Sequence, residues 1–212
     1  MNPEDVVYCV EKALYMAKNG NPGPVWLDIP MDIQEAEIDI SKSQHYIPEK
    51  NYKMNCTAEE IEYVVKALES AERPMVIVGQ GVRLAGACND LIDFIEKNQI
   101  PMVGTRMGWD IYPRNRELHI GLADTRGTRA GNFALQNADV VLCIGSRLSM
   151  MTTGYSYDLF LRAAKNFIVV DIDENEHRKG TVHIDKVINA DAKCFLGSLP
   201  KLNLKDISAW RE

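Results

Sequence analysis

Five short, mostly apolar runs between residues 75 and 190 constrain the fold more than any other feature of the sequence. They do not alternate apolar with polar residues, as Met-Val-Ile-Val and Val-Val-Leu-Cys-Ile illustrate, which indicates strands covered on both faces. The predicted strands are residues 75–79, 100–104, 140–145, 167–172 and 187–190. Helical patterns separate them, so the sequence predicts an α/β fold: an open, doubly wound, mostly parallel sheet with helices on both faces.

The helices between these strands are predicted from apolar residues that recur at steps of three and four. They cover residues 87–98, 129–137, 158–164 and 192–199. An earlier helix begins after Thr57, because Thr57 and Glu60 have the spacing of an N-cap residue and the helical residue that bonds back to it. We therefore predict a domain over residues 58–199.

The chain before this domain has a different pattern. Residues 3–18 form a predicted amphipathic helix, and residues 25–29 form a predicted short strand. A helix and one strand cannot bury both of their faces, because a sheet needs several strands and covering layers. These elements therefore either dock on the rest of the chain or have partners outside it. Residues 31–57 are polar, without a sustained period, and have the composition of a linker.

Composition and charge exclude several classes of function. The formal net charge is -6 and the arginines are scattered, so no basic surface is expected to attract a nucleic acid. No apolar run approaches the ~20 residues that cross a bilayer, and the N-terminus has no secretion signal, so we expect no membrane and a cytoplasmic location. The cysteines form no C-x-x-C pair, which indicates neither a disulfide framework nor a structural zinc site. They are Cys9, Cys56, Cys88, Cys143 and Cys194.

Ligands of such a sheet bind at the carboxyl ends of its strands, so the loops after the strands are the places to search. In "VIVGQGVRLAG", Gly79, Gly81 and Gly86 would let a phosphate approach backbone amides near a helix start. Their spacing differs from the G-x-G-x-x-G fingerprint, and a tight turn needed only for packing explains them equally well. Both interpretations stay open.

Two further loops have polar residues in suggestive places. In "GLADTRGTRAGN", residues 121–132, Thr128 would cap the next helix and two arginines would suit a pyrophosphate. The alternative is a solvated loop in which Asp124 pairs with an arginine. In "VVDIDENE", Asp171 or Asp173 would accept hydrogen bonds from ribose hydroxyls or cap the next helix.

No catalytic or metal-binding residue is predicted. The acidic pair Asp171 and Asp173 lacks a third metal ligand, and no Ser-His-Asp or Cys-His arrangement follows from spacing. The histidines lie in different segments without metal-ligand spacing: His45, His119, His177 and His183.

Taken in order, five segments of the chain resemble thiamine-diphosphate-dependent enzymes of the acetolactate synthase type. They are "GNPGPVWLDIPMDIQ", "PMVIVGQGVRLAG", "GTRAGNFALQNADVVLCIGSRL", "FIVVDIDENE" and "INAD", and they span nearly the whole chain. By this resemblance, residues 58–199 are the Rossmann-like central domain of a three-domain enzyme. That domain holds FAD in acetolactate synthase and glyoxylate carboligase, and another nucleotide or none in other members. A sirtuin-like deacylase, which shares this fold, would need zinc cysteines that the chain lacks.

The resemblance also divides the rest of the chain. Residues 1–30 resemble the terminal helix and strand of a truncated pyrimidine-binding domain, residues 31–57 a linker, and residues 200–212 the start of a linker to a diphosphate-binding domain. Thiamine diphosphate and magnesium would bind in those two domains, whose catalytic Glu and G-D-G motif are absent from this sequence. We therefore expect a fragment, inactive alone, of a 2-keto acid carboligase or decarboxylase, which is a transferase or lyase. Its partners would be those domains and, because the family forms dimers and tetramers, further copies of the parent.

The resemblance transfers cofactor contacts to twelve residues of this chain. They are Gly79, Gly81, Thr105, Gly121, Arg126, Gly127, Thr128, Gly145, Arg147, Asp171, Asp173 and Asp191.

Two departures from the flavin-binding pattern bear on FAD. Such relatives read G-M-L-G-M-H-G-T-R-A-A-N where this chain has Asp124 for a glycine and Arg126 for a histidine. They read G-A-R-F-D-D-R where it has Ser149, Met150 and Met151 for two acids and a base. Losing charged hydrogen bonds worth ~1.5–3 kcal/mol each would weaken dinucleotide binding about tenfold or more per contact. FAD, another nucleotide and a purely structural role remain alternatives, as does a freestanding FAD- or adenine-nucleotide-binding module.

Overall fold

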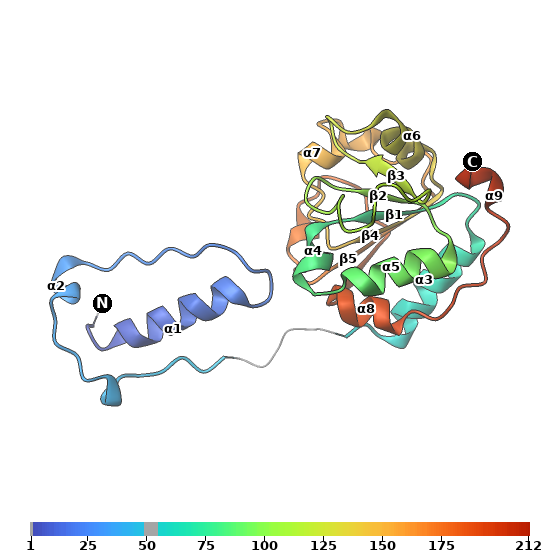
Figure 1. The fold of residues 1–212 in the computed structure, drawn as a ribbon. Coiled ribbons are helices and arrows are strands. Elements are labelled where there is room, and N and C mark those ends of the chain that lie inside the picture. The colour runs from blue at the N-terminus through green and yellow to red at the C-terminus, as the bar shows by residue number, and fades with distance from the viewer. Residues whose placement is uncertain (1, 49–54) are drawn as a thin grey trace. The chain divides into compact units, whose positions relative to one another are not determined.

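The structure of the protein is a computed structural model that describes residues 2–48 and 55–212 (Figure 1). The chain divides into two compact units, Met1–Tyr52 and Lys53–Glu212, which we call the N-terminal unit and the C-terminal unit. Residues 49–54 of the predicted linker lie outside the described residues. In the described part of the chain, no helix combines the length and the apolar character needed to span a bilayer.

The C-terminal unit is built on one six-stranded sheet. Its strands are β1 (Pro74–Val78), β2 (Met102–Gly104), β3 (His119–Leu122), β4 (Val140–Ile144), β5 (Asn166–Asp171) and β6 (Lys186–Asn189). The order across the sheet is β3-β2-β1-β4-β5-β6, and every neighbouring pair is parallel. The predicted α/β fold is confirmed, with a sheet that is parallel throughout.

Helices cover both faces of this sheet, as predicted. One face is covered by α3 (Ala58–Ser70), α5 (Cys88–Asn98) and α8 (Ala192–Ser198), and the other by α6 (Arg129–Asn137) (Figure 1). Alternate residues of a strand point to opposite faces. Val76 and Val78 of β1 therefore join the core under α3, α5 and α8, whereas Met75 and Ile77 join the core under α6. Because both faces are buried, the central strands are apolar at every position.

Two features of this unit differ from the sequence-based prediction. Strand β3, with the sequence His-Ile-Gly-Leu, was missed because His119 and Gly121 interrupt its apolar residues. The helix predicted over residues 158–164 is wrong, since the structure has only a short 3-10 helix there, Tyr157–Leu159. Leu161, which follows it, packs into the core beside α6 with a φ of 58°, a left-handed conformation that a right-handed helix cannot contain.

Short helices lie in the loops and at the end of the chain. They are α4 (Gln80–Leu84), α7 (Met150–Thr153), the 3-10 helix Glu176–Arg178, and α9 (Ser208–Arg211). The last residues pack on the C-terminal unit. The amide of Leu202 donates to Asn98 Oδ1 at 3.0 Å, and Trp210 Nε1 donates to the carbonyl of Pro74 at 2.9 Å. The assignment of residues 200–212 to a linker stays a prediction, but this stretch is anchored at the start of β1.

The capping box predicted at the start of α3 is present. Thr57 Oγ1 accepts the amide of Glu60 at 3.2 Å, and Glu60 Oε2 accepts the amide of Thr57 at 2.9 Å. Thr57→Ala is expected to lower the free energy of unfolding by about 1 kcal/mol, because the Glu60 amide loses its acceptor. Urea unfolding followed by circular dichroism measures the change. Thr57→Ser keeps the hydroxyl and should stay close to the wild type; an equal loss in both variants would contradict a capping role.

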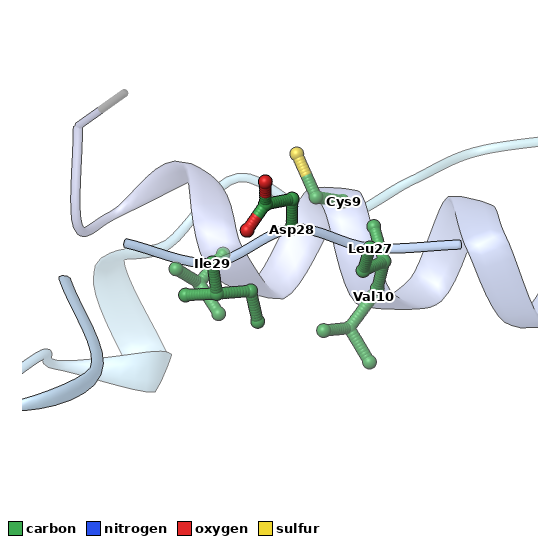
Figure 2. Close-up of a pocket in the computed structure, with 6 residues that line it drawn as sticks. Cys9, Val10, Leu27, Asp28 and Ile29 are labelled. Atoms are coloured by element: carbon green, nitrogen blue, oxygen red, sulfur yellow. The ribbon is translucent and has the colours of Figure 1, made fainter. Parts of the chain in front are cut away.

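In the N-terminal unit, helix α1 (Asp5–Lys18) lies against an extended segment. Residues 25–29 are extended but belong to no strand, so the predicted strand is wrong for this chain. A strand needs a neighbour with which to exchange backbone hydrogen bonds, and the described residues of this unit provide none. Figure 2 shows the extended segment beside α1, where Val10 lines a shallow pocket with Leu27 and Ile29. Trp26 is 91% exposed.

The segment after residue 29 contains α2 (Met31–Gln34) and the 3-10 helix Ile40–Lys42. It returns to α1 through Glu11, whose carboxylate accepts the amide of Tyr46 at 2.8 Å and lies 2.8 Å from His45 Nδ1. Part of the stretch predicted as a linker is thus folded onto α1. The finer division into residues 1–30, 31–57, 58–199 and 200–212 stays a prediction.

Candidate functional site at the carboxyl edge of the sheet

All twelve predicted contact residues lie at the carboxyl ends of the strands or directly after them. From one side of the sheet to the other, β3 and the loop after it contain Gly121, Arg126, Gly127 and Thr128, and Thr105 follows β2. Gly79 and Gly81 follow β1, and Gly145 and Arg147 follow β4. Asp171 ends β5, Asp173 lies in the loop after it, and Asp191 follows β6. The strand order reverses between β1 and β4, the position where ligands of such sheets bind. The sheet therefore gathers the twelve residues along one edge.

At the reversal point the loops after β1 and β4 touch through their backbones. The amide of Gly79 donates to the carbonyl of Ile144 at 3.0 Å, and the amide of Gly81 donates to the carbonyl of Gly145 at 2.8 Å. A Cβ added to Gly79 would lie 2.1 Å from the oxygen of Gly145, so no side chain fits there. Close packing of two loops is thus a sufficient reason for these glycines, and a ligand contact stays a prediction.

Thr105 ties the ends of β1 and β2 together. Its amide and its Oγ1 both donate to the carbonyl of Val78, at 2.8 and 3.0 Å, and the residue is buried. Because the hydroxyl proton is used inside the protein, Thr105 has a structural role that needs no ligand.

Thr128 caps α6, as predicted. Its Oγ1 accepts the amide of Gly131 at 3.1 Å and also the amide of Leu122 at 3.2 Å, which joins the helix start to β3. Gly121 faces this hydroxyl with a φ of +146°, and a Cβ there would lie 2.0 Å from Thr128 Oγ1. The conformation and the space both require glycine at this position.

The same loop contains a fully buried carboxylate. The side chain of Asp124 is 0% exposed and forms an ion pair with Arg106, whose Nη2 lies 2.9 Å from Oδ1 and whose Nε lies 3.3 Å from Oδ2. Asp124 Oδ1 also accepts the amide of Arg126 at 2.9 Å. The predicted pairing of Asp124 with an arginine is confirmed, but the partner is Arg106 from the neighbouring loop and the carboxylate is buried rather than solvated. Among the described residues, the exposed side chain of Arg126 has no ion pair or hydrogen bond.

The surroundings of Asp124 predict a pH dependence of stability. Burial by itself raises the pKa of this carboxyl. The hydrogen bond from the Arg126 amide and the Arg106 guanidinium together lower the pKa by more than burial raises it, so the pKa lies below the usual value. A carboxyl whose pKa is lowered by folding stabilises the fold at pH values above its unfolded pKa of about 3.9. This stabilisation is lost as the pH falls through the lower pKa of the folded state. The stability difference between wild type and Asp124→Asn should therefore shrink below about pH 4. Urea midpoints from neutral pH to acid pH test this; a difference independent of pH would contradict it.

The other acids of the edge hold backbone turns and basic side chains. Asp191 caps α8 by accepting the amides of Lys193 and Cys194 at 2.8 and 3.1 Å. Asp171 Oδ1 accepts the amide of Asp173 at 3.0 Å, and its Oδ2 lies 3.5 Å from Nε2 of the buried His177.

A buried carboxylate, Glu176, joins two cations between the ends of β4 and β5. Its Oε2 lies 3.1 Å from Arg147 Nε, and its Oε1 forms an ion pair with Lys179. Three further residues of this edge were not predicted from the sequence: Arg106, Glu176 and His177. The spacing of Glu176 and Lys179 is a usable helical signal, whereas the pairing of Arg106 with Asp124 depends on two loops that only the sheet brings together.

The family model "Thiamine pyrophosphate enzyme, central domain" matches residues 61–199. This match begins within α3 and covers the six strands of the sheet, helices α4 to α8 and all of the contact residues described above. The chain belongs to this family. The predicted resemblance is confirmed, and residues 61–199 are a central domain.

Curated relatives agree with the assignment to this family. The acetolactate synthase large subunit of Corynebacterium glutamicum is 36% identical over 216 residues, which cover 99% of this chain and 34% of that protein. Glyoxylate carboligase of Escherichia coli O157:H7 is 35% identical over 189 residues, which cover 88% of this chain and 31% of that protein. The chain spans about a third of the length of the curated relatives it matches.

A solved structure supports the fold. The X-ray structure of an enzyme from Mycobacterium smegmatis, described as thiamin diphosphate-dependent, matches with a TM-score of 0.75 at 20% identity. The match covers 95% of this chain and 38% of that one. At this identity the likeness concerns the arrangement of strands and helices in the central domain.

Within residues 2–48 and 55–212, no three His, Cys, Asp or Glu side chains are placed to hold a metal ion. At the start of α6, the amide of Arg126 is bonded to the Asp124 carboxylate, and the amide of Thr125 donates to the carbonyl of Met151 at 2.6 Å. These two amides are already used inside the protein, so a dinucleotide pyrophosphate at this loop would not find them free.

Proposed function

We propose that this chain is the central domain of a thiamine-diphosphate-dependent 2-keto acid carboligase or decarboxylase of the acetolactate synthase type. The observation that supports the proposal is the family match over residues 61–199, together with relatives that are about three times as long as this chain. The parent reaction is then a transferase or lyase reaction, in which thiamine diphosphate supplies the carbanion chemistry.

The role proposed for the central domain is to join two catalytic domains. Its own residues form a parallel sheet whose loops are joined by the hydrogen bonds of Thr105, Thr128 and Asp124, and it contains no catalytic residue in this proposal. The stretch of residues 200–212, held by Trp210 at the start of β1, would fix where the chain leaves the domain. Thiamine diphosphate and magnesium would bind in the pyrimidine- and diphosphate-binding domains and not in this chain.

The N-terminal unit fits a role as the end of a pyrimidine-binding domain. Residues 25–29 are extended without a partner strand, and Trp26 is exposed. A neighbouring strand of the parent would pair with this backbone and cover the indole ring. Assembly of the parent into a homo-oligomer and its cytoplasmic location are further parts of the proposal. No feature of the fold or of the relatives favours the alternative of a freestanding FAD- or adenine-nucleotide-binding module.

The test compares this chain with the full-length protein encoded by its reading frame. With thiamine diphosphate, magnesium and pyruvate, the full-length protein should release carbon dioxide or form a carboligation product, and this chain alone should do neither. The frame should also encode a G-D-G motif after residue 212. Turnover by this chain alone, or a frame without that motif, would contradict the proposal.

A further inference from the structure

The loop between β3 and α6 contains a negatively charged side chain, Asp124, whose carboxylate is inaccessible to solvent. Its backbone is fixed to α6 as well, because the Asn132 side-chain amide donates to the Asp124 carbonyl at 2.9 Å. The carboxylate is therefore held in one place by two adjoining elements.

The groups around this carboxylate are those that bind phosphate in other proteins. A guanidinium fork from Arg106 contacts both of its oxygens, at 2.9 and 3.3 Å. The amide of Arg126 donates to Oδ1 at 2.9 Å, and Thr125 Oγ1 lies 3.4 Å from the same oxygen. A planar guanidinium and a backbone amide just before a helix are a common oxyanion site.

We propose that Asp124 is a built-in counter-ion that takes the place of a ligand phosphate at the β3–α6 loop. With the carboxylate present, a pyrophosphate would meet a like charge and would find the Arg106 guanidinium already paired. The charges of the wild-type loop are consequently paired without a nucleotide, and the loop excludes a nucleotide. Asp124 thereby determines specificity at this edge, and Gly121, Gly127 and Thr128 shape a self-contained loop.

The opposite side of the loop agrees with this proposal. The amide of Thr125 donates to the carbonyl of Met151, which lies in α7. At and just before the start of α7 the chain has Ser149, Met150 and Met151, none of which is charged. Arg126 is the exposed cation of the loop that has no partner among the described residues, and it lies one residue from the Thr125 amide. A pyrophosphate would therefore find one unpaired cation and no free amide from Thr125 or Arg126.

The test is an anion rescue of Asp124→Gly, which places a glycine where flavin-binding relatives have one. The probe is inorganic pyrophosphate at constant ionic strength without divalent cations, and the readout is the melting temperature of this chain. Wild type should not respond. The variant should melt lower without the probe and should gain roughly 3–6 °C when pyrophosphate exceeds its Kd about tenfold, because the anion pairs with Arg106 again.

Asp110→Gly is the matched control. Asp110 also pairs with an arginine at the carboxyl edge, at 2.7 Å from Arg83 Nη2, but its side chain is 57% exposed, whereas that of Asp124 is fully buried. This variant removes the same charge and should gain nothing from pyrophosphate, because exposed pairs are screened by water and salt. An equal gain in Asp110→Gly would mean unspecific binding and would overturn the proposal.

Asp124→Asn keeps the inference testable where the glycine variant does not fold. It removes the charge and keeps the size of the side chain, and isothermal titration should give at least about tenfold tighter pyrophosphate binding than in wild type. Binding of equal strength in wild type, or no binding in any folded Asp124 variant, overturns the proposal. Because the readout is binding by this chain, its failure is separate from any failure of the proposed parent activity.

Discussion

Gly79→Ala is expected to lower the free energy of unfolding by about 3 kcal/mol or more. The added Cβ would lie 2.1 Å from the carbonyl oxygen of Gly145 and 2.6 Å from the Cα of Ser146. Both are backbone atoms, and the loop of Gly145 is fixed by the amide of Gly145, which donates to the carbonyl of Val170 at 2.9 Å. The loops after β1 and β4 must therefore separate, which breaks the bonds that join them. Urea unfolding followed by circular dichroism measures the loss.

Gly197→Ala is the control for this substitution. Gly197 lies inside α8, and a Cβ there would meet no atom within 4 Å. The same chemical change should raise the free energy of unfolding by about 0.5–1 kcal/mol, because alanine favours the helix over the unfolded chain. If Gly79→Ala were as stable as wild type, the backbone contact of the two loops would not exist in solution.

The central strands could be predicted from the sequence because both of their faces are buried. In β1, β4 and β5, almost every residue is buried, so a run of apolar residues is sufficient evidence for each strand. Strand β3 has no such run, because His119 and Gly121 interrupt its apolar residues. Residues 25–29 have a strand-like sequence, but a strand also needs a partner backbone, which the pattern of side chains does not reveal.

The place of the site was predictable, whereas its internal pairing was not. Once the strands were identified, parallel topology put the residues after them at one edge, and all twelve lie there. The ion pair of Asp124 with Arg106 joins residues 18 positions apart on neighbouring loops, so it depends on the order of β2 and β3. A glycine-rich loop in the sequence is equally compatible with a phosphate site and with the close loop packing seen at Gly79.

Asp139→Ala is expected to lower the free energy of unfolding by about 3–6 kcal/mol, from two hydrogen bonds to a charged group at ~1.5–3 kcal/mol each. Asp139 is buried at the amino edge of the sheet, just before β4. Its Oδ1 and Oδ2 accept the amides of Arg73 and Glu72 at 2.8 and 3.0 Å, which holds the turn that precedes β1. Alanine leaves both amides without this acceptor. The urea midpoint of this chain at neutral pH measures the effect.

Two further variants show whether stability depends on the carboxylate oxygens of Asp139 or only on the size or the charge of an acidic side chain. Asp139→Asn keeps the shape and one acceptor oxygen, so it should lose about half as much stability as alanine, because one of the two amides stays bonded. Asp158→Ala removes an exposed acid and should change the free energy of unfolding by no more than about 0.5 kcal/mol. If Asp139→Ala and Asp158→Ala were equally stable, the amino edge would not depend on the Asp139 carboxylate. A loss of stability in the Asp139 variants alone would mean that the Asp139 side chain joins β1 and β4 at the amino edge of the sheet, opposite the candidate site. This connection needs no ligand.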